Sequence, residues 1–239
     1  MKYKLFVVAV IIIAAVFLGC KGNNGSLPGE VNFDKDASYA LGLNIGASFR
    51  EGMTADNIFP ILDEFMKGMK DGITDSNQRF SLEEAREKIE TAFQAASEQK
   101  KTDLMDKENA FLAENAKKPG VKITASGLQY EIIILEDGPK PGEEDTVLVN
   151  YNATFTDGTP FDSTPDGEPA SIGLNQVIAG WKEGLQLMGV GSKYMFYIPS
   201  AIGYGEQGMT DWSGNQVIPP YAVLIFEVEL LGIEPNTGG

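Results

Sequence analysis

The feature that most constrains this chain is a change of hydrophobic period at Lys117-Lys118-Pro119-Gly120. Before this point, residues 82–118 contain neither glycine nor proline, and the capping pattern Ser81-Leu82-Glu83-Glu84 opens the stretch. After it, apolar and polar residues alternate, as they do in strands with one buried face. The sequence therefore predicts an α+β chain in which helices come first and an antiparallel sheet follows.

The part before this change predicts three helices. The first begins near Asp36 and closes at Gly52, and the second covers roughly residues 56–71, with Pro60 in its first turn or two. From Ser81, a helix of about 35 residues would be about 50 Å long. Its first half has an apolar stripe, and residues 97–103 are polar on every face, which predicts a helix that leaves a domain and crosses solvent. The alternative is two helices broken near residue 100.

The part after the change predicts strands and one short helix. Turn signals such as Asp137-Gly138-Pro139 and Asp157-Gly158 separate the strand patterns. The expected strands cover residues 128–135, 146–155, 192–198 and 222–231. The short helix is expected around residues 175–188, within which VIAGWKEGLQLM carries one of the two tryptophans of the chain.

The first twenty residues predict a secretion signal. An uncharged apolar run follows Lys2 and Lys4, and its length of about 14 residues falls short of the roughly 20 that span a bilayer. It ends in Phe17-Leu18-Gly19-Cys20, which resembles a bacterial lipoprotein lipobox, with phenylalanine in place of the usual leucine. We expect a signal peptide at residues 1–19, lipidation at Cys20, a flexible tether at residues 20–35, and a location in the bacterial cell envelope, facing the periplasm or the outside. The alternatives are an ordinary cleaved signal peptide and an uncleaved anchor.

The composition excludes several kinds of chemistry. Histidine is absent, which removes imidazole acid–base catalysis, Ser-His pairs and most zinc sites. We therefore expect neither a metal nor a cofactor. The formal net charge is −15, and residues 119–239 hold 16 acidic side chains against four lysines and no arginine. Such a surface repels phosphate backbones, so nucleic acid is not an expected partner.

Five phrases of the second half occur in an order that identifies a family. They are Tyr151…Phe161-Asp162-Ser163, Val177-Ile178-Ala179-Gly180-Trp181, Gly203-Tyr204-Gly205, Ile218-Pro219-Pro220, and the strand 224–230. Together they resemble the FKBP-type peptidyl-prolyl cis-trans isomerases over about residues 125–233. Residues 36–118 are similar, more loosely, to the helical dimerisation region of the macrophage infectivity potentiator-like lipoprotein branch.

The resemblance implies an architecture and a set of partners. It implies a helical dimerisation domain with its connecting helix at residues 36–118, and an isomerase domain at residues 119–239 whose antiparallel sheet wraps a short helix. The partners would be proline-containing unfolded or exported proteins, macrolide inhibitors and a second copy of the chain.

The resemblance also implies a site. Tyr151, Asp162, Tyr204 and Phe226 would be catalytic, and Phe161, Val177, Ile178, Trp181 and Ile218 would bind substrate. Trp181 would form the floor of an apolar pocket, and Ile218 would overhang its mouth. Ala170 or Ile172 stands where the family has an aromatic wall residue, so a wider pocket is expected there. Taken singly, each residue also fits a structural role, since a lone tryptophan in a short amphipathic helix is usually core.

The expected function is isomerisation of X-Pro amides during the folding of exported proteins. This reaction twists an amide and needs no proton transfer, nucleophile or metal, so a histidine-free chain can catalyse it. Two alternatives stay open: a holdase-like chaperone that binds clients without turnover, and an adhesin or ligand-display lipoprotein with a vestigial pocket. The loop GEQGMTDWSGNQVIP is about five residues longer than the family's usual loop. Its Trp212 either contacts residues that flank proline or lies in an insertion without a role.

Overall fold

The computed structural model describes residues 33–56, 59–165 and 168–234. These residues fall into two compact units, one that ends at Ser76 and one that begins at Asn77. The predicted signal peptide, Cys20 and most of the predicted tether lie outside the described residues. Within the described part of the chain, no helix is long and apolar enough to cross a membrane.

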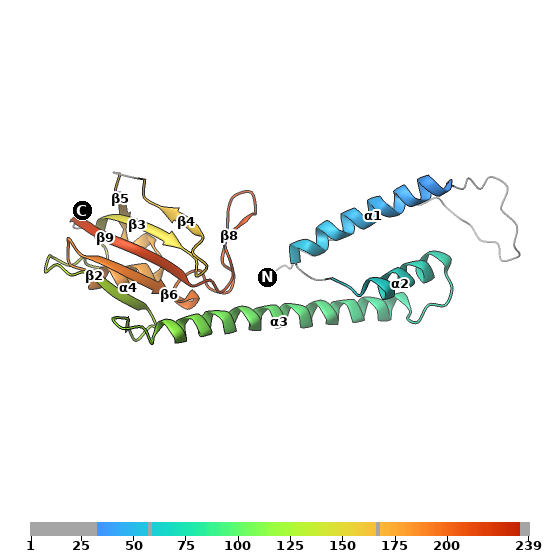
Figure 1. Ribbon diagram of the computed structural model, residues 1–239, viewed down its shortest axis with the longest axis horizontal. Coiled ribbons are helices and arrows are strands. Elements are labelled where there is room, and N and C mark those ends of the chain that lie inside the picture. Colours follow the sequence, from blue (N-terminus) through green and yellow to red (C-terminus); the bar gives the residue numbers. More distant parts are fainter. Residues whose placement is uncertain (1–32, 57–58, 166–167, 235–239) are drawn as a thin grey trace, which may run out of the picture. The chain divides into compact units, whose positions relative to one another are not determined.

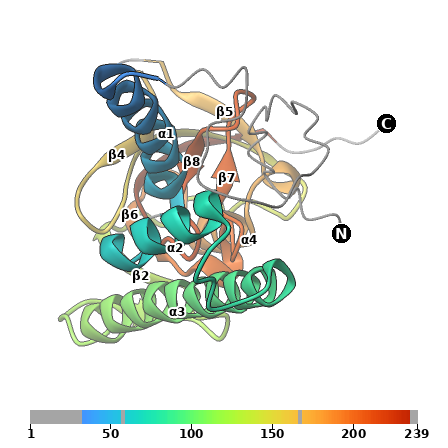
Figure 2. The same ribbon diagram turned by 90° about the vertical axis from the view of Figure 1, so that its right-hand side faces the viewer.

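The first unit contains the helices α1 (Lys35–Asp56) and α2 (Leu62–Thr74) (Figures 1 and 2). The ring of Phe49 stacks on that of Phe65, with 4.5 Å between ring centroids, and so joins the two helices. Helix α2 begins later than the sequence predicts, and Pro60 precedes it. The reason is that a residue before proline is restricted to extended conformations, so a helix cannot run through that position without strain.

Many apolar side chains of the first unit are exposed to solvent. The exposed fraction is 72% for Tyr39, 61% for Leu43 and 80% for Ile73. Others in the same helices that are also exposed are Leu41, Ile45, Leu62 and Met66. Two helices by themselves therefore leave much of their apolar surface uncovered.

The second unit opens with α3 (Leu82–Asn115), a single helix of 34 residues. The predicted capping box is present: the Glu84 N–H donates to Ser81 Oγ at 3.2 Å, and the Ser81 N–H donates to Glu84 Oε2 at 2.8 Å. The helix is continuous, so the alternative of a break near residue 100 is wrong. Leu82, Ile89 and Phe93, in its first half, are exposed like those of α1 and α2.

The rest of the second unit is an antiparallel sheet with strand order β1-β2-β6-β9-β3-β4, and β5 also pairs with β3 (Figure 1). The strands are β1 (Lys122–Ile123), β2 (Gln129–Ile134), β3 (Thr146–Thr154), β4 (Pro160–Ser163), β5 (Ala170–Gly173), β6 (Lys193–Ile198) and β9 (Leu224–Glu234). The four strands expected from the sequence correspond to β2, β3, β6 and β9. A separate hairpin pairs β7 (Met209–Thr210) with β8 (Gln216–Ile218). The strands that the sequence analysis missed have at most four residues, too few to establish a period.

One helix, α4 (Ala179–Leu187), packs on the sheet, as expected. It begins later than predicted, because residues 174–176 form a separate 3₁₀ turn and Val177 is extended. Gly180 and Gly184 face the sheet, and a Cβ at Gly184 would lie 2.8 Å from the ring of Phe196. These glycines therefore allow the helix to approach the sheet closely. The α+β class and the order of its parts are confirmed.

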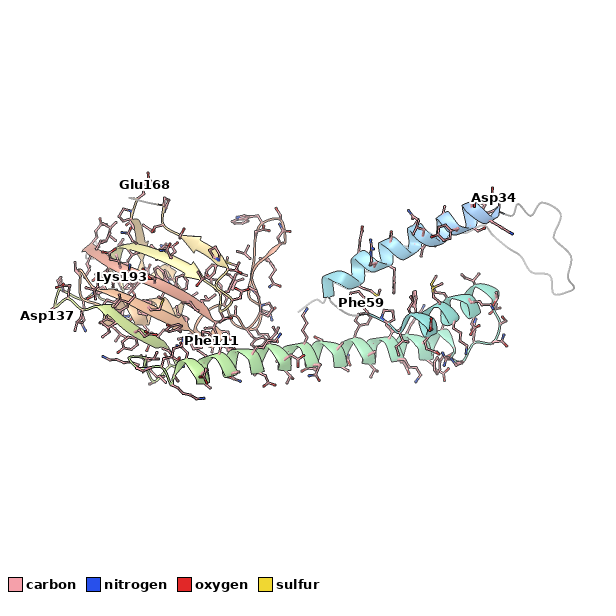
Figure 3. The ribbon with its side chains drawn as sticks, viewed as in Figure 1. Asp34, Phe59, Phe111, Asp137, Glu168 and Lys193 are labelled. Atoms are coloured by element: carbon pink, nitrogen blue, oxygen red, sulfur yellow. The ribbon has the colours of Figure 1, made fainter. Side chains whose placement is uncertain are left out.

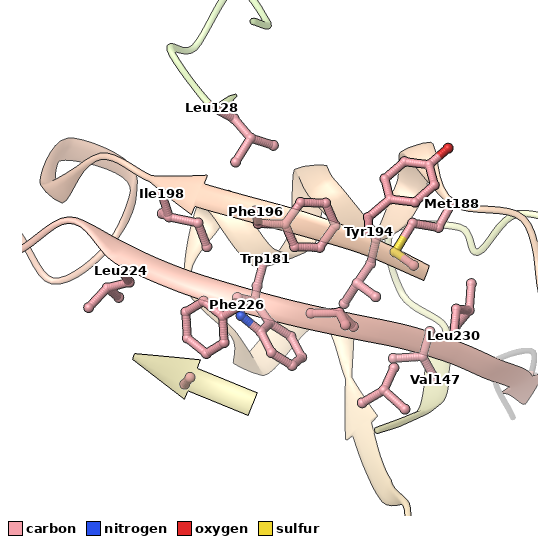
Figure 4. Close-up of a cluster of buried hydrophobic side chains, with 14 of the residues drawn as sticks. Leu128, Val147, Trp181, Met188, Tyr194, Phe196, Ile198, Leu224, Phe226 and Leu230 are labelled. Atoms are coloured by element: carbon pink, nitrogen blue, oxygen red, sulfur yellow. The ribbon is translucent and has the colours of Figure 1, made fainter. Parts of the chain in front are cut away.

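The core of this unit lies between α4 and the sheet (Figure 4). Leu185 of α4 and Phe196 of β6 are both fully buried. Alternate residues of the long strands complete it: Val147, Val149, Leu224, Phe226, Val228 and Leu230. The period of two in the sequence therefore marks the face of the sheet that α4 covers.

Candidate functional site

Four aromatic rings from four elements meet at one end of the core. They are Tyr151 of β3, Phe161 of β4, Trp181 of α4 and Phe226 of β9, hereafter the aromatic cluster. The Trp181 ring meets those of Tyr151 and Phe226 edge to face, with 5.1 Å between centroids in both pairs. Phe161 meets Phe226 edge to face at 5.6 Å. These are favoured geometries for aromatic pairs, and they fix the rings relative to one another.

Trp181 is the most buried ring of the cluster. Its exposed fraction is 4%, and Figure 4 shows its indole beside the Phe226 ring. Within the described residues, no group accepts a hydrogen bond from its Nε1–H. A buried donor without an acceptor costs about 1–3 kcal/mol, so packing of the rings, not hydrogen bonding, holds this indole in place.

A carboxylate and two phenols lie at the edge of the cluster. The Tyr151 hydroxyl donates to Asp162 Oδ2 at 2.7 Å, and the Ser163 N–H donates to Asp162 Oδ1 at 2.9 Å. Burial, together with the hydrogen bond and the charge of Asp162, raises the pKa of Tyr151. Burial and the charge of Asp162 also raise the pKa of Tyr204. Both phenols therefore keep their protons at neutral pH and can act as neutral hydrogen-bond donors.

Two of the other predicted site residues lie at the start of α4, and the third, Ile218, ends β8. Val177 and Ile178 are half-buried and precede its first turn. The Ile178 N–H comes before the helix, so no helical carbonyl accepts from it. Ile218 is only 1% exposed and packs in the core, so it presents little surface at the mouth of the site.

One aromatic residue next to the site was missed by the sequence analysis. The Phe155 ring stacks on that of Phe161, with 4.6 Å between centroids. Phe155 follows Tyr151 by four residues in the same strand pattern. The period of two therefore puts both side chains on one face of the sheet, and this signal could have identified Phe155 as a neighbour of the site. Ala170 and Ile172, one of which is expected at the family's aromatic wall position, are both half-buried against the core.

A groove of about 250 Å³ lies next to the cluster, between α3 and the loop that follows β8. Phe111 near the end of α3 lines it (Figure 3), as do Pro219, Pro220 and Phe155. Within the described residues, no group of histidine, cysteine or acidic side chains is arranged to hold a metal ion.

Comparisons with known proteins fit this architecture. The family model described as FKBP-type peptidyl-prolyl cis-trans isomerase matches residues 138–231, and the model of the domain amino-terminal to such isomerases matches residues 34–132. The fold and these two matches thus define an isomerase domain preceded by a helical domain.

Similar proteins cover most of the chain. The FKBP-type peptidyl-prolyl cis-trans isomerase FkpA of Aeromonas hydrophila is 43% identical over 85% of this chain and 77% of that protein. The outer membrane protein MIP of Legionella longbeachae is 36% identical over 98% of this chain and 99% of that protein. The crystal structure of FkpA from Escherichia coli has a TM-score of 0.63 and 31% identity, and covers 85% of this chain and 98% of that one. The chain belongs to the family of FKBP-type peptidyl-prolyl cis-trans isomerases, the enzymes that interconvert cis and trans X-Pro amides.

Proposed function

We propose that the aromatic cluster is the catalytic site, and that it holds a proline side chain above Trp181. The observation that carries this proposal is that Tyr151, Phe161, Trp181 and Phe226, from four separate elements, meet beside Asp162 and the neutral phenol of Tyr204. Prolyl rings are apolar, so an aromatic floor and walls suit them.

The proposed mechanism needs only an apolar surrounding for the X-Pro amide and hydrogen-bond donors for its carbonyl oxygen. Resonance makes the planar amide more charge-separated than the twisted one, so an apolar surrounding disfavours the planar ground state. The carbonyl oxygen of the twisted amide would accept from the Ile178 N–H or the Tyr204 hydroxyl. Such preorganised donors stabilise the transition state more than the ground state, which is how binding becomes catalysis. Asp162 would keep Tyr151 oriented through their hydrogen bond.

The test is isomerisation of an X-Pro peptide, measured with a coupled protease, with and without a macrolide inhibitor of the family. We expect Asp162→Ala and Tyr204→Phe each to lower kcat/KM by about tenfold, the loss of one hydrogen bond of about 1.4 kcal/mol. Tyr130→Phe makes the same chemical change in β2, where Tyr130 stacks on Tyr194, and is the control. Full activity in Phe161→Ala would rule out the aromatic cluster as the site.

We infer that two copies of the chain associate through their helices. The exposed apolar side chains of α1, α2 and the first half of α3 support this, because burying them in water-free contact is favourable and a second copy offers the same surface. Light scattering on the mature protein should give twice the chain mass. Leu43→Glu, at a position 61% exposed, should give one chain mass without unfolding α1. A single chain mass for the unsubstituted protein at micromolar concentration would contradict the dimer.

We further propose that the protein is anchored in the cell envelope by a lipid on Cys20 and assists the folding of exported proteins there. Support comes from the signal-like residues 1–20 and from the relative named as an outer membrane protein. Cys20→Ser should move the protein out of the detergent phase. If that variant partitions into detergent after its signal is cleaved, acylation is the wrong explanation.

The holdase alternative differs in one measurable respect. The exposed apolar side chains of α1 and α2 could also hold an unfolded client. If Tyr204→Phe suppresses aggregation of an unfolded client as well as the unsubstituted protein does, client binding is independent of turnover.

A further inference from the structure

The last part of α3 is attached to the sheet domain by a carboxylate. Glu108 accepts two hydrogen bonds from Ser200: its Oε1 accepts from the backbone N–H at 2.6 Å, and its Oε2 accepts from the side-chain hydroxyl at 2.8 Å. Ser200 is 5% exposed and begins the 3₁₀ turn that follows β6. Two short bonds to one carboxylate are charge-assisted and directional, and they fix Ser200 relative to α3.

Ser200 in turn organises the loop that carries Tyr204. Its carbonyl oxygen accepts from the Gly203 N–H at 2.9 Å and from the Gly205 N–H at 2.8 Å. These are the two neighbours of Tyr204 in the chain, and Gly205 has a positive φ of 64°. Glycines on both sides impose little conformational restriction of their own, so the direction of the Tyr204 ring depends on what anchors the loop.

Other hydrogen bonds and an ion pair also attach this part of α3 to the sheet domain. Asn115 and Gln129 are both buried, the Asn115 side-chain N–H donates to Gln129 Oε1 at 2.9 Å, and the Gln129 side-chain N–H donates to the Leu112 carbonyl at 2.9 Å. Lys101 pairs with Glu206 at 3.4 Å, but both side chains are substantially exposed. Exposed pairs contribute little, whereas Glu108 reaches the loop with two directional, part-buried bonds to the buried Ser200.

We propose that Glu108, a residue of the connecting helix and not of the isomerase domain, is a positioning residue that holds Tyr204 at the aromatic cluster through Ser200. The inference rests on the proposed role of Tyr204 in catalysis. Tyr204 lies close enough to Asp162 for the carboxylate charge to act on it, so a shift of its loop would move the hydroxyl away from the reacting carbonyl. Errors of about 1 Å in such groups are enough to slow catalysis.

The test compares Glu108→Gln with Glu114→Gln in the full mature chain. Glu114 is on the same helix, but it pairs with Lys117 at the surface, with both side chains more than two-thirds exposed. Glutamine keeps the size of the side chain and turns one acceptor oxygen into a donor group. We expect Glu108→Gln to lower kcat by about threefold to tenfold at little-changed KM, and Glu114→Gln to match the unsubstituted protein. Ser200→Ala, which keeps the backbone bond, should lower kcat less.

A double-mutant cycle with Tyr204→Phe separates positioning from general destabilisation. If Glu108 acts through the Tyr204 hydroxyl, Glu108→Gln should cause no further loss in the Tyr204→Phe background. Equal losses in both backgrounds, or a Glu108→Gln variant as active as Glu114→Gln, would overturn the inference while the role of Tyr204 stands. A fully active Tyr204→Phe variant would instead overturn the proposed role of Tyr204, and the route through Glu108 with it. Circular dichroism at the assay temperature confirms that each variant is folded.

Discussion

Replacing Trp181 and Leu185 by alanine separates a pocket floor from ordinary core. Both residues lie on α4, four positions apart on the same face of the helix, with exposed fractions of 4% and 0%. Truncation of a buried tryptophan costs about 3–5 kcal/mol and of a buried leucine about 2–5 kcal/mol, so the two changes lower stability by overlapping amounts. Leu185→Ala is therefore a stability control for Trp181→Ala.

The expected difference lies in activity. Trp181→Ala also removes two edge-to-face contacts, with Tyr151 and Phe226, each of about 0.5–1.5 kcal/mol. If those contacts hold the walls of the site, the loss of about 1–3 kcal/mol lowers kcat/KM by roughly five- to 150-fold. Leu185 does not belong to the aromatic cluster, so Leu185→Ala should keep kcat/KM within about twofold of the unsubstituted protein.

The assay should run at about 10 °C, where both variants stay folded and uncatalysed isomerisation takes minutes. Urea unfolding gives the two stability losses, the protease-coupled assay gives kcat/KM, and fluorescence titration gives macrolide binding. Equal losses of kcat/KM in both variants would refute the reasoning, because activity would then follow stability alone. A fully active Trp181→Ala variant would show that this tryptophan has a structural role in the core and none in the reaction.

Three further predictions concern ionisation and the inserted loop. Since the chain has no histidine and the pKa values of Tyr151 and Tyr204 are raised, kcat/KM should be flat from about pH 6 to 8; a steep profile there would contradict catalysis without ionisation. The raised pKa of Tyr151 means that the folded state favours its protonated form, so the stability that this group contributes is complete below about pH 10 and is lost as pH rises further. The urea midpoint should therefore fall more between about pH 9 and about pH 11 in the unsubstituted protein than in Tyr151→Phe. Equal falls in the two proteins would contradict this. Trp212 is fully exposed on the β7–β8 hairpin, so Trp212→Ala should change the ranking of X-Pro peptides by residue X without loss of stability, and an unchanged ranking would leave the insertion without this role.

Local signals in the sequence determined the class and the order of parts. The capping box at Ser81 and the stretch without glycine or proline are properties of neighbouring residues, and they led to one helix of 34 residues. The alternation after Pro119 likewise marked the long strands, because a half-buried strand repeats every two residues. The family phrases named the four residues of the aromatic cluster, and their rings are in contact in the structure. The start of α2 was misplaced because Pro60 conflicts with the helical pattern.

Tertiary structure alone decided how the site is supported. Glu108 has no special spacing in the sequence, and its partner Ser200 lies 92 residues away. The strand order β1-β2-β6-β9-β3-β4 makes neighbours of segments that are far apart in the chain, and so brings rings of β3 and β9 against Trp181 of α4. The burial of Ile218, predicted to overhang the mouth, also depended on packing of distant residues. Hydrogen bonds and contacts of this kind leave no period in the sequence, because each depends on where two separate segments come together after the chain has folded.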